Sequence, residues 1–201
     1  MKILKTISLW GIIVSLGFVV LAGCRKRIAP ATDDYAEYGW TVINDGNYTS
    51  ALTQFQDALQ LDPENADAYN GLGWIFSRMN EPDSALVYFN TGMGLATPAS
   101  QIQLEIYTGR AFSYHAKQQY LSGIDDCNEV LATDSNFVFS RDTTVTANSV
   151  AALLAANYFG VGDFTNALLA VQVVDPTFQV DVNTEAGLAL LSAKIEALIT
   201  G

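Results

Sequence analysis

The amino-acid sequence predicts an all-α protein, an α-solenoid in which short helices stack in repeated units. Residues recur at an offset of 34 positions: Tyr35, Gly39, Ala51 and Phe55 return as Tyr69, Gly73, Ala85 and Phe89. Apolar residues within a unit also follow the helical period, as do Ala51, Leu52, Phe55, Ala58 and Leu59. One unit cannot bury its apolar face alone, so three or more units must stack. A hydrophobic content of 50% supplies enough apolar surface for the resulting core.

The N-terminus predicts a targeting segment that precedes the repeats. Lys2 and Lys5 are followed by an almost unbroken apolar run of 14 residues, from Leu9 to Ala22. Such a run is short for a membrane-spanning helix but suits the apolar region of a signal peptide. The residues after it, Leu21-Ala22-Gly23-Cys24, resemble the lipobox of bacterial lipoproteins, in which the cysteine is lipidated and begins the mature chain.

On this resemblance, residues 1–23 form a lipoprotein signal peptide, Cys24 carries the lipid and residues 24–31 form a tether. The resemblance implies a bacterial envelope protein that faces the periplasm, with the outer membrane favoured over the inner. The alternative is an uncleaved membrane anchor beginning near Ile7. The basic run at positions 25–27 supports that alternative, because positive charges after an apolar segment oppose translocation.

The first two repeat units, residues 32–65 and 66–99, carry a family resemblance. The first unit has the pattern of two helices joined by a turn. Gly39 lies in its first helix, Gly46-Asn47-Tyr48 form the turn and Pro63 follows the second helix. The second repeats this pattern, with Pro82 at the start of its second helix. The pattern resembles the tetratricopeptide repeat (TPR) family, whose 34-residue units stack into a right-handed superhelix.

Two further units are expected at residues 104–137 and 148–178, which extends the TPR domain over residues 32–178. The third places Cys127 at a small-residue position of its second helix, so we expect its thiol to be buried and inert. The fourth reaches Pro176 about three residues early, so its second helix should be about one turn short.

Two segments lie outside the repeats. Residues 138–146 join the third and fourth units and predict a long loop, which is either functional or a tolerated insertion; the insertion is favoured. Residues 179–201 are expected to contain a capping helix over residues 184–200, with Leu188, Leu191, Ile195 and Leu198 on its packed stripe. Leu190 and Ile199 lie off that stripe and leave open a self-association face.

The charge distribution disfavours nucleic acid as a partner. From Ile28 onward, five basic residues stand against all 21 acidic residues, which gives this part a formal charge of −16. A surface of that sign repels phosphate backbones.

No catalytic constellation can be assembled, so we expect neither an enzyme nor a cofactor. His115 is the only histidine, and a simple hydrogen-bonding role is favoured over general-base catalysis. One histidine and two cysteines cannot close a four-ligand zinc site, so no metal is expected.

The TPR resemblance implies a concave groove lined by the first helix of each unit. One groove position is held by Trp40, Trp74 and Phe112 in successive units. The polar residues expected to flank these rings are Asp33, Glu37, Asp67, Asn70, Arg78, Glu105 and His115. The rings could simply pack neighbouring helices together. We favour a binding site for an extended peptide, or for a helix, that carries apolar anchors and some positive charge.

The sequence therefore predicts a lipid-anchored periplasmic scaffold that captures a protein or peptide partner in this acidic, aromatic groove for envelope assembly. Two alternatives stay open. The aromatic row could stack on glycan rings, or the protein could form homo-oligomers through its last helix.

Overall fold

A computed structural model describes residues 31–200, which form nine α-helices. The predicted signal peptide, Cys24 and most of the tether lie outside the described residues. The helices are α2 (Thr32–Asn44), α3 (Tyr48–Leu61), α4 (Ala66–Arg78), α5 (Pro82–Leu95), α6 (Gln101–Ala116), α7 (Tyr120–Thr133), α8 (Ala147–Gly160), α9 (Phe164–Val174) and α10 (Glu185–Thr200). None of these helices is long and apolar enough to cross a membrane.

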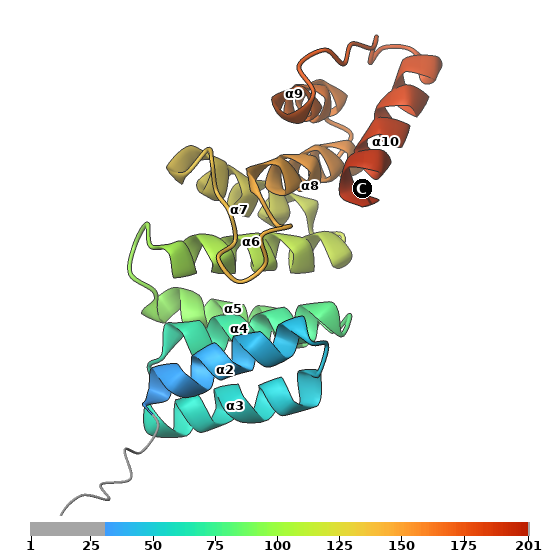
Figure 1. Ribbon diagram of the computed structural model, residues 1–201. Helices are drawn as coiled ribbons and strands as arrows, with labels where there is room; N and C mark the ends of the chain where they lie inside the picture. The colour runs from blue at the N-terminus through green and yellow to red at the C-terminus, as the bar shows by residue number, and fades with distance from the viewer. Residues whose placement is uncertain (1–30, 201) are drawn as a thin grey trace, which may run out of the picture. The chain divides into compact units, whose positions relative to one another are not determined.

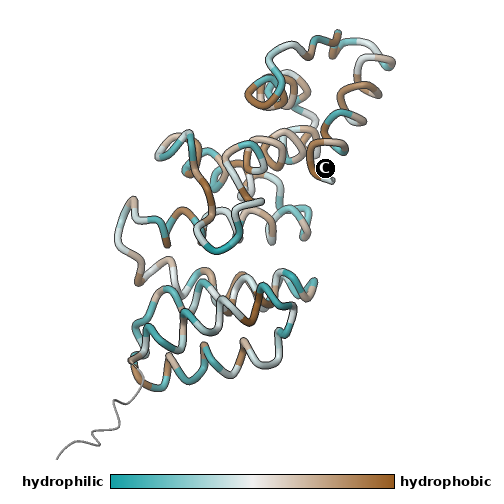
Figure 2. Tube along the Cα trace, in the orientation of Figure 1, coloured by the Kyte–Doolittle hydropathy of each residue, from teal (hydrophilic) through white to brown (hydrophobic). Residues whose placement is uncertain are grey.

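The helices follow one another as antiparallel pairs, and each pair packs on the next (Figure 1). The expected all-α repeat fold is confirmed. Within α2–α7 and α10, hydrophobic and hydrophilic residues are interspersed, as expected of helices with one buried face (Figure 2). Residues 150–155 of α8 are all buried, because α6, α7, α9 and α10 surround that helix.

Local sequence signals set the helix ends. The side chains of Asn47, Asn65, Ser100 and Asp163 each accept a hydrogen bond from a backbone N–H in the first turn of the following helix. Because Ser100 caps α6, that helix begins at Gln101, three residues before the expected start of the third unit. Helix α9 has 11 residues where α3, α5 and α7 have 14, so the expected shortening is confirmed.

Glycine and phenylalanine bring the helices close together at the centre of the repeats. The ring of Phe55 in α3 lies against Gly39 of α2 and Gly71 of α4, and Phe89 lies likewise against Gly73 and Gly109. A Cβ atom added at Gly71 would lie 2.2 Å from Cζ of Phe55. The rings therefore occupy space that only glycine leaves free.

The last helix covers the end of the stack. Leu191 and Ile195 of α10 are buried, while Leu190 is 59% exposed. Lys194 of α10 forms an ion pair with Asp175, 2.8 Å away, just after α9. This helix caps the fourth unit, as the sequence predicts.

Candidate functional site

Successive first helices bring an aromatic row together. Trp40 lies on α2, Trp74 on α4 and Phe112 on α6. Trp40 and Trp74 are only 2% and 5% exposed. Both rings are therefore buried in this conformation, and the binding role favoured for them stays a prediction.

The loop between α7 and α8 covers the two tryptophans. In Figure 1 this loop runs from α7 across α6 and returns to α8. Phe139 in the loop stacks on Trp74, with ring centroids 4.8 Å apart and planes at 24°. It also meets Trp40 edge-on at 5.5 Å. We call the surface of α2, α4 and α6 beneath residues 137–146 the groove, and these residues the groove loop.

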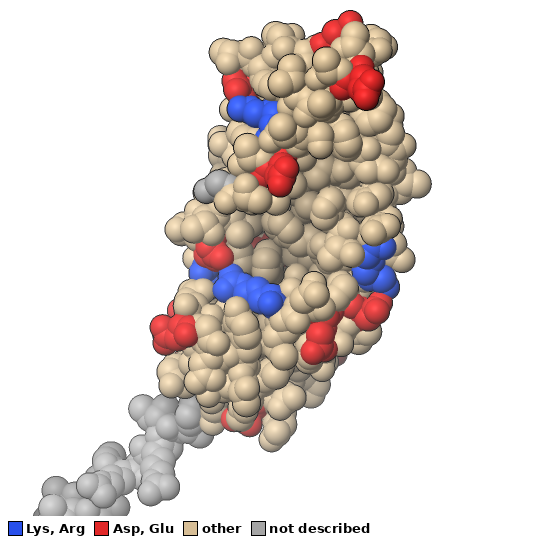
Figure 3. Space-filling view, turned by 90° about the vertical axis from the view of Figure 1, so that its right-hand side faces the viewer, with Lys and Arg blue, Asp and Glu red and all other residues tan. Residues whose placement is uncertain are grey.

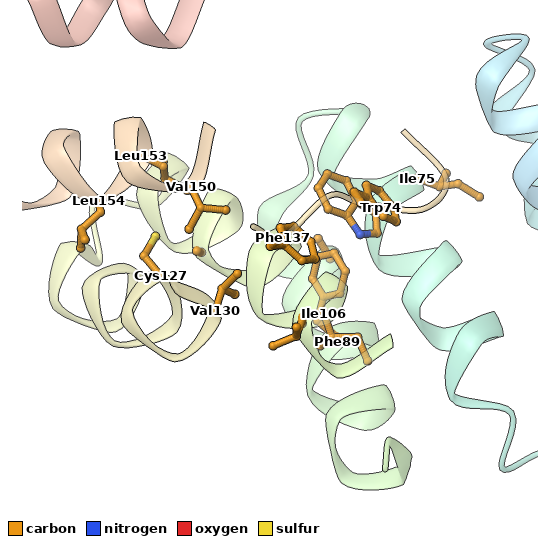
Figure 4. Packing of buried hydrophobic residues seen from close by; sticks show 14 of the residues in the cluster. Trp74, Ile75, Phe89, Ile106, Cys127, Val130, Phe137, Val150, Leu153 and Leu154 are labelled. Atoms are coloured by element: carbon orange, nitrogen blue, oxygen red, sulfur yellow. The ribbon is translucent and has the colours of Figure 1, made fainter. Parts of the chain in front are cut away.

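Backbone hydrogen bonds hold the groove loop as a closed, ordered structure. Val138 and Thr146 form an antiparallel bridge. The N–H of Phe139 donates to the carbonyl of Val145 (2.9 Å), and the N–H of Ala147 donates to that of Phe137 (2.7 Å). Phe137 is fully buried, between Trp74 and Phe89 on one side and Val130 and Val150 on the other (Figure 4). The loop is therefore a packed part of the fold, and whether it is functional or a tolerated insertion stays a prediction.

Arg141 at the loop tip carries positive charge into the acidic part of the groove. Its guanidinium pairs with Glu37 of α2 and lies 3.4 Å from Asp67 of α4. The guanidinium also sits 5.9 Å from the centre of the Trp40 ring, and the backbone carbonyl of Arg141 accepts a hydrogen bond from Asn44 (3.0 Å).

Asp67 connects the charge cluster to the aromatic row. The indole N–H of Trp40 donates to both carboxylate oxygens of Asp67 at 3.1 Å. Burial raises the pKa of the Asp67 carboxyl, although Arg141 and the Trp40 hydrogen bond both act to lower it. A cation beside Asp67 thus favours its charged form.

Glu105 of α6 is a buried carboxylate that binds the loop backbone. It is 1% exposed and accepts hydrogen bonds from the N–H (3.1 Å) and the hydroxyl (2.7 Å) of Ser140. The side chains of Gln101 and Asn70 also donate to it, each at 3.0 Å. A buried carboxylate needs such donors, and the loop supplies two of the four.

A second ion pair fixes the other side of the loop tip. Arg78 at the end of α4 lies 2.8 Å from Asp142. Asp142 in turn accepts hydrogen bonds from the N–H and the hydroxyl of Thr144. Of the ion pairs in residues 31–200, those of Arg78 and Arg141 join the loop to the groove. In the face that Figure 3 shows, basic side chains lie beside acidic ones and most of the surface is uncharged.

Two buried polar atoms of α4 have no hydrogen-bond partner among the described residues. Among the described residues, neither Oδ1 of Asn70 nor Nε1 of Trp74 has a hydrogen-bond partner, and both atoms are buried. The two residues are four positions apart on one helix, so they lie on the same face. One atom is an acceptor and the other a donor.

Two of the expected site residues lie toward the C-terminal side of this cluster. Phe112 packs on Trp74, with centroids 6.2 Å apart, and lines a cavity of about 350 Å³. The other residues that line the cavity are Thr144, Val145, Ser149, Leu198, Ile199 and Thr200. His115 lies 2.8 Å from Oδ1 of Asn157 in α8 and packs on Tyr120. It joins the third and fourth units, which suits the hydrogen-bonding role favoured for it.

Cys127 is fully buried in α7, as expected. Burial raises the pKa of its thiol well above the usual range, so the thiolate that would react is disfavoured. No group of histidine, cysteine and acidic side chains within residues 31–200 could hold a metal ion.

The sequence predicted the aromatic groove positions but not that the loop between α7 and α8 would fill the groove. The loop residues whose contacts were not predicted are Phe137, Phe139, Ser140 and Arg141. Two signals point to them: a Phe-Val-Phe sequence, unusual in an exposed loop, and one of the five basic residues of an otherwise acidic body.

Comparisons with known proteins agree with this architecture. The family model described as TPR repeat matches residues 44–80. A segment of 48 residues is 42% identical to the cell division cycle protein 16 homolog of Homo sapiens, and covers 24% of this chain and 8% of that protein. This chain therefore spans less than a tenth of the length of that curated relative.

Solved structures resemble the chain over a longer range. The APC/C hetero-tetramer Cut9-Hcn1 matches with a TM-score of 0.64 over 84% of this chain and 30% of that chain, at 15% identity. MamA from Desulfovibrio magneticus RS-1 matches with a TM-score of 0.58 over 72% of this chain and 74% of that chain, at 19% identity. At these identities the likeness concerns the fold alone.

Proposed function

Because this chain is a tetratricopeptide-repeat protein, we propose that it is a binding scaffold that captures an extended segment of a partner protein in the groove. The segment would lie across α2, α4 and α6 and present an aromatic side chain and a positive charge. We further propose that the scaffold is lipid-anchored through Cys24, faces the periplasm and serves assembly in a bacterial cell envelope.

One observation carries the binding role: the groove already holds an extended segment of this chemistry. Aromatic contact at Trp40 and Trp74, carboxylates at Glu37 and Asp67, and backbone capture by Glu105 together bind residues 139–141. Rings, carboxylates and a buried acceptor recognise side chains and backbone at once, as peptide-binding surfaces do. The covered faces of Trp40 and Trp74 give a stacked sugar ring no access in this conformation.

A photo-crosslinking residue at Thr41 tests partner capture in the native envelope. Thr41 is exposed on α2, and it lies one turn from Glu37 and three residues from Asn44, which both contact the groove loop. Thr53 on α3 is the matched control, because it is also an exposed helical threonine whose hydroxyl donates to the carbonyl four residues earlier. We expect one abundant protein adduct at Thr41 and none at Thr53. Recovery of only this chain, or equal yields at both positions, would contradict the proposal.

The lipid anchor is tested separately by metabolic labelling with a clickable fatty acid. We expect label on the wild-type chain, and none after Cys24→Ser. An unlabelled wild-type chain that stays in the membrane fraction would instead favour the uncleaved anchor.

A further inference from the structure

We propose that the groove loop is an intramolecular ligand, which a partner segment of matching chemistry must displace in order to bind. The segment would be extended and would carry an aromatic residue followed two positions later by arginine or lysine, as do Phe139 and Arg141. This inference rests on the proposed binding function and adds its regulation and the recognised pattern.

The contacts of the loop define that pattern. Phe139 fills the space between Trp40 and Trp74, and Arg141 reaches Glu37 and Asp67. The residue between them, Ser140, is held mainly through its backbone N–H and hydroxyl by Glu105. Ring, backbone and cation are thus bound by three different parts of the groove. A segment from another protein that offers the same three groups could make the same contacts with the two tryptophans, with Glu105 and with the two carboxylates.

The loop satisfies the groove incompletely, which gives a competing segment an advantage. The acceptor Oδ1 of Asn70 and the donor Nε1 of Trp74, both on α4, are buried without hydrogen-bond partners among the described residues. A buried polar atom that lacks a hydrogen bond lowers the stability of the state that contains it. An extended peptide carries a backbone donor and an acceptor in every residue. A partner segment could therefore pair atoms that the loop leaves unpaired.

A cavity beside the loop offers a first contact before the loop leaves. It has a volume of about 350 Å³ and adjoins Thr144 and Val145, the limb of the loop that returns to α8. Phe112, Leu198 and Ile199 give it apolar walls. A partner segment that first binds in this cavity would lie next to Phe112, which packs on Trp74.

Binding of a synthetic peptide with the loop sequence tests the proposal. The probe is a fluorescein-labelled peptide of residues 136–146, Asn-Phe-Val-Phe-Ser-Arg-Asp-Thr-Thr-Val-Thr, added to the full chain purified in detergent. A peptide of the same composition in scrambled order controls for simple charge attraction. We expect Arg141→Ala to bind the probe about tenfold more tightly than wild type, because the weakened loop leaves the groove open for a larger fraction of the time.

Two further variants separate release of the loop from a change in charge. Lys117→Ala also removes one positive charge, but its partner Asp83 lies away from the loop, so we expect wild-type affinity. Adding Glu37→Gln to Arg141→Ala should reduce the gain, since the arginine of the probe then keeps only Asp67 as a carboxylate partner. Equal binding to wild type and Arg141→Ala, or no binding to either, would overturn the proposal.

Hydrogen exchange supplies a second readout that does not depend on affinity. The amides of Phe139 and Val145 are hydrogen-bonded within the loop. Binding of the probe to wild type should accelerate their exchange, because the loop must leave the groove. Unchanged or slower exchange in the presence of bound probe would show that the loop stays in place, and would overturn the proposal. A Thr41 adduct without these effects would leave the scaffold function standing and remove only the loop as its competitor.

Discussion

At the scale of single residues, the contact between Gly71 and Phe55 sets how closely α3 and α4 approach. Gly71→Ala would place a methyl group 2.2 Å from the buried ring, so the helices must separate or the ring must move. We expect a loss of about 1–3 kcal/mol in the free energy of unfolding, measured by urea titration. Gly94→Ala in α5 is the matched control, because nothing lies within 4 Å of its Cβ position. It should gain about 0.5–1 kcal/mol, because alanine loses less backbone freedom than glycine when a helix forms. Equal effects of the two variants would contradict this packing.

Asp67 gives the groove a distinct dependence on pH. Burial raises the pKa of its carboxyl above the usual 3.8, so the folded chain holds this proton more tightly than the unfolded chain. The stability that Asp67 contributes is therefore present at acid pH and is lost as pH rises through the raised pKa. Asp67→Asn keeps an acceptor for Trp40 and does not titrate. We expect its stability relative to wild type to increase as pH rises above 3.8, measured by urea unfolding at several pH values.

Asp181 supplies the opposite case as a control for that experiment. The N–H of Asn183 donates to its carboxylate at 3.0 Å and lowers the pKa of the carboxyl. The stability that Asp181 contributes is lost as pH falls. Asp181→Asn should therefore lose stability relative to wild type as pH rises. The same direction of change for both variants would show that burial does not govern Asp67.

At the scale of elements, the 34-residue offset made the paired helices and their stacking predictable from the sequence. Gly39 and Phe55 recur as Gly73 and Phe89 because the same glycine–phenylalanine contact packs the helices of each unit together. The repeat of these residues in the sequence therefore predicts the repeat of the helix pairs. The groove positions follow from the same register, which is why Trp40 and Trp74 were placed together. The loop has no counterpart in the other units. Its contacts with α2 and α4 join residues 64 to 104 positions apart, for example Arg141 to Glu37, and no periodicity in the sequence encodes such pairs.

Helix α10 shows how a cap differs from an interface on the same element. Leu191 is fully buried against the stack, whereas its neighbour Leu190 is 59% exposed. We expect Leu191→Ala to cost about 2–5 kcal/mol in a thermal or urea unfolding experiment, because the cavity it leaves lies in the packed interface. Leu190→Ala should leave the unfolding midpoint unchanged.

Sedimentation of the same two variants tests the self-association alternative. If the exposed side of α10 joins two copies of the chain, Leu190→Ala should lower the fraction of dimer while the fold stays intact. A wild-type chain that is monomeric at high concentration would remove that alternative.

At the scale of the whole molecule, the groove loop adds contacts between repeat units that are not neighbours in the stack. In a simple solenoid each unit contacts only its neighbours, so its ends can unfold separately. Here residues 139–142, which follow the third unit, contact α2 and α4 of the first and second units. These contacts join units that would otherwise be coupled only through the units between them. They should therefore make unfolding more cooperative.

Replacing residues 138–145 by a Gly-Ser linker of equal length tests this cooperativity. In a chain that lacks residues 1–23, and with them Trp10, tryptophan fluorescence reports on Trp40 and Trp74 in the first two units, and circular dichroism reports on all helices. In wild type we expect the two urea unfolding curves to coincide. In the linker variant the fluorescence midpoint should fall below the circular dichroism midpoint, because the first two units lose their tie to the rest. A linker over residues 176–182, before α10, is the control and should leave the fluorescence midpoint in place. Coincident curves in the loop variant would mean that the stack alone makes the molecule cooperative.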